Sequence, residues 1–104
     1  MPVTLEDFRA WVARGGEPPD LSPPLRALWL DGTGDWSAAH DLANEIEPPD
    51  GARIHAYLHR KEGDADNARY WYRQAGRAPF EGSLADEWSA LAGELLGRGA
   101  GALR

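Results

Sequence analysis

The 104-residue chain contains no cysteine, a single methionine and no apolar run long enough to cross a membrane. The lack of cysteine excludes disulfides and thiolate metal sites and makes a reducing cytosol the expected compartment. Near the N-terminus no basic segment leads into an apolar run, as an export signal would require. We therefore expect a cytoplasmic protein that does not contact a membrane.

The chain also has no excess of basic residues, since its net charge is −6. A general nucleic-acid binder needs a positively charged surface, so we expect no nucleic-acid partner. The charge is nevertheless uneven: residues 1–50 carry −7, residues 51–80 carry +3 and the remainder carries −2. The basic zone of this acidic protein therefore lies between residues 51 and 80.

No segment alternates apolar and polar residues for long enough to indicate a strand. Apolar residues instead recur at helical spacing between Gly, Pro and capping residues. We predict a single all-α domain over residues 1–104 with about six helices. All five tryptophans lie on apolar stripes and are expected in the core, and the glycine-rich tail 97–104 is expected to fray. The expected helix caps are Thr4, Ser22, Asp35, Asp50, Asp64 and Ser83.

The segment from Ile54 to Pro79 predicts a helix, a Gly63-Asp64 turn and a second helix, because Gly63 can close one helix and Asp64 can cap the next. A similar pattern occurs about 29 residues earlier. That shift places Ala27, Gly34, Asp35 and Ala39 on Ala56, Gly63, Asp64 and Ala68. We interpret 27–46 and 56–75 as an internal repeat, giving two stacked αα-hairpins with a flanking helix at each end.

The turn and small residues of the second hairpin, with Tyr72, Ala75 and the following Pro79, resemble the tetratricopeptide and Sel1-like repeat pattern. The segment ARYWYRQA is especially similar to the Sel1-like form. The resemblance covers the second hairpin well and the first only loosely, and it implies a groove lined by the inner helix of each hairpin. The chain also resembles an uncharacterised family of small bacterial proteins with HAYLHRKEGD and NARYWYR signatures, which implies no function.

Four residues of the basic zone, Arg53, Tyr57, Arg60 and Lys61, match groove-facing positions of such an inner helix. Two guanidiniums, an ammonium and a phenol suit the recognition of carboxylates. We hypothesise that the chain is a protein-interaction module that binds an acidic or C-terminal peptide segment there. The alternative is a solvated helix face, neutralised by the acidic first half of the chain.

Other features of the sequence bear on this hypothesis. Tyr70 and Arg73 of the following helix are further candidate contacts, since Tyr and Arg are enriched at binding hot spots. The first hairpin has Leu28 and Asp31 at equivalent positions and does not repeat the basic character. The apolar helix expected at 84–96 leaves both a monomer and a homodimer open.

A second hypothesis rests on His55 and His59, which lie i, i+4 on one predicted helix with Glu62 one turn further. Two such imidazoles can chelate a divalent metal, and the same group with Arg60 could form a polar pocket for a small ligand or a reaction. A third protein ligand would have to come from elsewhere, for instance His40. The alternative is that both are hydrogen-bonded packing histidines, and from the sequence we assign no metal, cofactor or catalytic residue.

Overall fold

The computed structural model describes residues 3–16 and 20–98, and within them the chain forms six helices and no strand. The prediction of an all-α fold with about six helices is confirmed. None of the helices in the described ranges is long and apolar enough to cross a membrane. The helices are α1 (Leu5–Arg14), α2 (Pro23–Gly32), α3 (Trp36–Ala43), α4 (Asp50–Lys61), α5 (Ala65–Ala75) and α6 (Leu84–Gly97).

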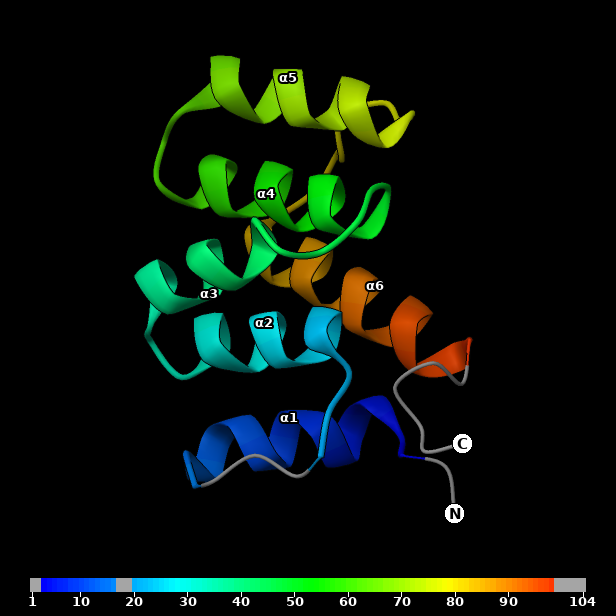
Figure 1. Cartoon of the computed structure of the whole chain (residues 1–104). Helices are drawn as coiled ribbons and strands as arrows, with labels where there is room; N and C mark the ends of the chain where they lie inside the picture. Colours follow the sequence, from blue (N-terminus) through cyan, green and yellow to red (C-terminus); the bar gives the residue numbers. More distant parts are fainter. Residues whose placement is uncertain (1–2, 17–19, 99–104) are drawn as a thin grey trace.

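The helices form a column with one helix laid along its side. Figure 1 shows α1, the α2–α3 hairpin and the α4–α5 hairpin stacked in chain order, with α5 at the end away from α1. After α5 the chain turns back, and α6 packs against α1, α2 and α4. The side of the hairpins on which a groove was expected is therefore partly covered by the chain's own last helix.

The two hairpins turn in the same way. Gly34 and Gly63 adopt φ values of 98° and 88°, a region that side chains other than glycine rarely enter. The next residue, Asp35 or Asp64, accepts a hydrogen bond from a backbone N–H three positions on, at 3.0 and 3.1 Å. The local chemistry predicted for these turns, a left-handed glycine followed by an aspartate cap, is present in both.

The other expected caps have mixed outcomes. Thr4 and Ser83 accept hydrogen bonds from the N–H groups of Asp7 and Asp86, as predicted. Ser22 is the N-cap residue of α2, as predicted, but its side chain makes no capping bond and its buried oxygen has no partner in the described part of the chain. The prediction for Asp50 is wrong, because α4 begins at Asp50 itself, and that carboxylate pairs instead with Arg98 at 2.8 Å.

The end of the chain was expected to fray from residue 97. Gly97 is the last residue of α6, and the guanidinium of Arg98 makes the ion pair with Asp50. The rest of that tail, 99–104, lies outside the described residues.

The main core lies between α1, α2, α4 and α6, and its largest fully buried side chains are Phe8, Leu25, Leu28, Ile54 and Leu58. The prediction that all five tryptophans belong to the core holds fully for Trp88 and in part for the others. Trp88 is buried, since α6 lies over α1 and α2, and its indole N–H donates to the carbonyl of Leu28 at 3.0 Å. Trp11, Trp29 and Trp36 are half-buried and pack against this core, and Trp71 packs against a smaller buried cluster.

Replacement of two helical glycines by alanine tests this packing, because the two changes are expected to alter the free energy of unfolding in opposite directions. A Cβ at Gly51 would collide with the carbonyl oxygen of Ile46, whereas a Cβ at Gly93 would meet nothing within 4 Å. We expect Gly51→Ala to lower the free energy of unfolding by about 1–3 kcal/mol through overpacking. Gly93→Ala should raise it by about 0.5–1 kcal/mol through helix propensity. Urea denaturation followed by circular dichroism measures both, and equal effects of one sign would contradict the packing of α4 on the preceding loop.

Candidate functional site

The cations of the predicted basic face are all engaged within the chain. Arg53 pairs with Glu94 at 2.8 Å, and Lys61 pairs with Asp31 at 2.9 Å. Arg60 pairs with Glu87 at 2.6 Å and also donates to the carbonyl oxygen of Gly82 at 2.7 Å. Both glutamates belong to α6, so this helix supplies the acidic groups that the hypothesis assigned to a partner.

Two buried carboxylates, Asp31 and Glu87, connect neighbouring helices at this surface, because each accepts hydrogen bonds from a tyrosine and a cation. Tyr57 donates its hydroxyl to Asp31 at 2.8 Å, and Tyr72 donates to Glu87 at 2.5 Å. Burial, followed by the hydrogen bond to Asp31, raises the pKa of Tyr57 well above its usual value. Burial and the bond to Glu87 raise the pKa of Tyr72 to about 12. Both phenols therefore stay protonated and act as hydrogen-bond donors.

The predicted contacts thus divide into two groups. Tyr57 is only 3% exposed, so its side chain is not presented to a partner. Tyr70 is 44% exposed, and Arg73 is also exposed; both lie on α5, the helix at the end of the stack. The structure therefore separates Tyr70 and Arg73, which face solvent, from Arg53, Tyr57, Arg60 and Lys61, which hold α2 and α6 against α4.

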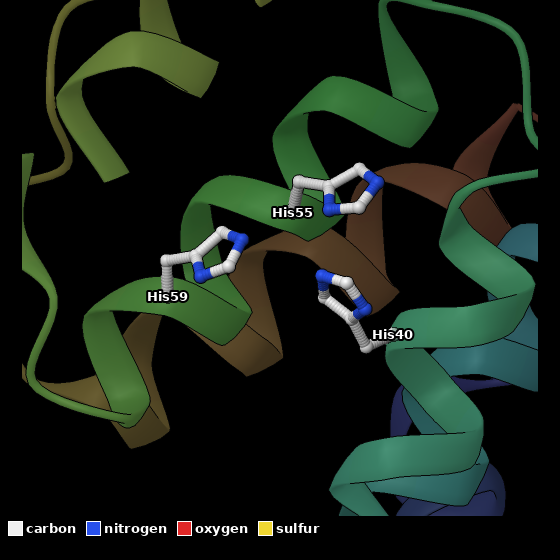
Figure 2. Close-up of side chains that lie close together, drawn as sticks. All are labelled: His40, His55 and His59. Atoms are coloured by element: carbon white, nitrogen blue, oxygen red, sulfur yellow. The ribbon is translucent and has the colours of Figure 1, made fainter. Parts of the chain in front are cut away.

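By contrast, the structure brings the histidines of the second candidate site close together. His55 and His59 on α4 meet His40 on α3, and one nitrogen of each ring lies within 4.8 Å of the others. The ring centroids of His40 are 4.8 Å from His55 and 5.2 Å from His59. Figure 2 shows the three imidazoles converging on one space between the two helices. We call His40, His55 and His59 the histidine cluster.

Glu62 fixes which ring nitrogen of His59 carries the proton. The Nδ1 atom of His59 lies 2.7 Å from a carboxylate oxygen of Glu62. An ionised carboxylate only accepts hydrogen bonds, so Nδ1 carries the proton and donates it. In the neutral ring the free lone pair is then on Nε2, the nitrogen that is not used by Glu62. A carboxylate behind a histidine in this way is the usual outer support of a metal-binding imidazole.

His55 is the least satisfied member. It is 3% exposed, and its buried Nδ1 has no hydrogen-bond partner among the described residues. Buried polar atoms are rarely left without a partner. Burial, and then the charges of His40 and His59, lower the pKa of His55 to about 4. At neutral pH the ring is therefore uncharged and offers a lone pair.

Two indoles hold the cluster in place. Trp71 stacks on His55 with centroids 4.1 Å apart, and Trp36 stacks on His40 at 5.0 Å. The N–H of Trp36 donates to the carbonyl of Leu58 at 2.9 Å, which fixes that ring between α3 and α4. These contacts restrict the rotamers of the histidines, as a preorganised site requires.

Sequence reasoning identified His55, His59 and Glu62 from helical spacing but had no signal to place His40. A contact between two helices depends on how α3 crosses α4, and no spacing along the chain encodes that crossing. The pairing of Asp31 and Glu87 with the basic face was missed for the same reason. The acidic first half of the chain, which was expected to neutralise that face, supplies Asp31, whereas Glu87 and Glu94 come from α6.

Comparisons of the chain with protein-family models, with curated proteins and with solved structures found no match. The resemblance to tetratricopeptide and Sel1-like repeats therefore stays a prediction.

The lowered pKa of His55 gives the metal-free protein a pH dependence. The unfolded chain binds this proton near pH 6.5 and the folded chain only near pH 4, so stability is complete above 6.5 and falls as the pH drops through this window. The loss attributable to His55 between pH 7 and pH 4.5 is about 2–3 kcal/mol.

Urea denaturation in the presence of a chelator measures this loss, with His55→Gln as the comparison. The variant keeps His40, His59 and Glu62, so the rest of the cluster is the same in both proteins. An equal loss in both proteins would contradict the assignment to His55.

Proposed function

We propose that the chain binds a divalent metal ion at the histidine cluster. Two observations carry this proposal: three imidazoles converge on one space, and the buried Nδ1 of His55, one of the three, has no hydrogen-bond partner among the described residues. A metal ion would accept the lone pair that no protein donor satisfies. Packing alone accounts for the stacked indoles but leaves that nitrogen without a partner.

The distances are compatible with coordination after a small adjustment. Zinc binds imidazole at about 2.0–2.1 Å, which places two ligand nitrogens of a tetrahedral site roughly 3.3 Å apart. The nitrogens here lie within 4.8 Å, so the rings close by at most about 1.5 Å. His40 is the half-buried member and the one that lies on α3, so closure of the rings requires α3 to approach α4 slightly.

The donor set narrows the choice of ion. Three neutral imidazoles favour zinc and the late first-row metals over calcium or magnesium, which prefer oxygen ligands. Glu62 supports His59 and keeps the tautomer that frees Nε2. Three protein ligands leave one position of a tetrahedral ion for water or a small ligand. We assign no reaction to that position.

Metal titration tests this proposal. Zinc at about 100 times its Kd should raise the free energy of unfolding by about 2.7 kcal/mol, and cobalt(II) should give the visible absorption of a tetrahedral nitrogen site. His40→Ala should abolish both effects, and Glu62→Gln should weaken binding about 10–100-fold.

Asp66→Asn is the matched control, because Asp66 is an exposed acid outside the cluster and its variant should bind as the wild type does. Isothermal titration calorimetry gives the affinities. Stoichiometric binding that survives in His40→Ala and His55→Gln would overturn the proposal.

We infer a second function, protein interaction, for the exposed side of α5. Tyr70 is the exposed large hydrophobic side chain of the described residues, and Arg73 has no ion-pair partner among them. The guanidinium of Arg73 supports an acidic partner segment, because the other cations of the basic zone at 51–80 already pair within the chain. The docking surface then consists of Tyr70 and Arg73 rather than the face that α6 covers.

Fluorescence polarisation with a labelled peptide of alternating glutamate and leucine tests this inference. The wild type should bind the peptide, and binding should weaken about tenfold or more in a Tyr70→Ala, Arg73→Glu double variant. Arg14→Glu serves as the control, because it makes the same change of charge at an exposed arginine of α1, outside this surface. Equal binding by all three proteins would contradict a site on α5.

A further inference from the structure

A cleft of about 290 Å³ opens where α1, α2, α4 and α6 meet. None of the residues that line it belongs to the histidine cluster. The volume is just below the range of about 300–1,000 Å³ that holds drug-sized ligands. A molecule bound there is therefore small, of the size of one ring or a short branched chain with a single polar group.

The cleft carries an excess positive charge. Arg9 contributes a guanidinium whose hydrogen bond goes to the hydroxyl of Ser89 at 2.5 Å, and no carboxylate of the described residues pairs with it. The charge of Lys61 is balanced by Asp31. Since a guanidinium has five N–H donors in a planar fork, Arg9 can bind a carboxylate through two of them while it keeps Ser89.

The buried carboxylate of Asp31 limits which charged groups a ligand of this cleft can carry. Both of its oxygens are used, one by the hydroxyl of Tyr57 and one by the ammonium of Lys61. Asp31 therefore needs no further donor, and a second negative charge on the ligand would be repelled by it. A monocarboxylate fits these charges better than a dicarboxylate or an amine.

The remaining wall is apolar and rigid. It includes the side chains of Val12, Ala85 and Trp88. The indole of Trp88 is fixed on one side by its hydrogen bond to Leu28 and on the other by stacking against Phe8, with centroids 5.5 Å apart. A fixed aromatic wall suits the compact apolar body of a small acid, because little ordering is required when it binds.

We propose that this cleft binds a small organic monocarboxylate, with Arg9 and Ser89 holding the carboxylate and Val12 and Trp88 contacting its apolar body. The carboxylate belongs either to a free acid or to the last residue of a peptide. The site is independent of the proposed metal, since it shares no side chain with the histidine cluster.

Two-dimensional NMR titration with phenylacetate and its uncharged counterpart phenylacetamide tests this site. Phenylacetate should shift the indole N–H resonance of Trp88 in a saturable way, and phenylacetamide should bind at least about tenfold more weakly, because it lacks the charge-assisted bonds to Arg9. A short peptide ending in phenylalanine, compared with its C-terminally amidated form, shows whether a peptide can be the source of the carboxylate.

Two arginine variants of α1 locate the binding of the acid. Arg9→Gln should weaken phenylacetate binding about tenfold or more, whereas Arg14→Gln, the same change on the same helix but outside the cleft, should not. His40→Ala should leave phenylacetate binding unchanged, so a failure of the metal site does not affect this test. Equal binding of the acid and the amide, or no saturable shift at about 10 mM, would overturn the proposal.

Discussion

Two buried carboxylates, Asp31 and Glu87, decide how the helices fit together. A buried charge is costly unless it is paired and hydrogen-bonded, and each of these acids receives one phenol and one cation. Asp31 ties α2 to α4, while Glu87 ties α6 to α4 and α5. Loss of one partner from such a group typically costs about 3–5 kcal/mol, because the remaining charge stays buried. The position of α6 along the column therefore follows from charge pairing as much as from apolar packing.

These pairs also account for a difference between the two hairpins. The shift of about 29 residues that superimposes their turns places Asp31 on Arg60. Each of these residues bonds to a later part of the chain, Asp31 to Lys61 of the second hairpin and Arg60 to Glu87 of the flanking helix α6. The first hairpin carries an acid because it meets a basic helix, and the second carries a base because it meets an acidic one. The first hairpin thus lacks the basic character of the second because its charges complement those of the helix on which it packs.

What could be predicted from the sequence was mostly local. The left-handed glycines at 34 and 63 and the caps at Thr4, Asp35, Asp64 and Ser83 depend on residues within one helical turn, so their spacing indicates them directly. The sequence predicted the pair of His55 and His59 in the histidine cluster, because these two residues share one helix. It did not place His40 beside them, because His40 lies on another helix. Ion pairs between helices far apart in the chain, such as Arg60 with Glu87, depend on tertiary packing that periodicity does not encode. The tryptophans show the same limit, because a stripe indicates which side of a helix is apolar but not how deeply it is covered.

Helix α6 has a consequence for which sides of the stack stay open. Stacked helical repeats need a terminal element that closes their exposed faces, because an open face invites further units or other copies. Here the last helix does not continue the column but runs back beside it and neutralises the cations of α4. Anything that docked on that side would have to displace α6, which would take Glu87 away and leave Arg60 and Tyr72 without their carboxylate. The inner side of the hairpins is thus closed by a helix of the same chain, whereas the outer side of α5, with Tyr70 and Arg73, stays exposed.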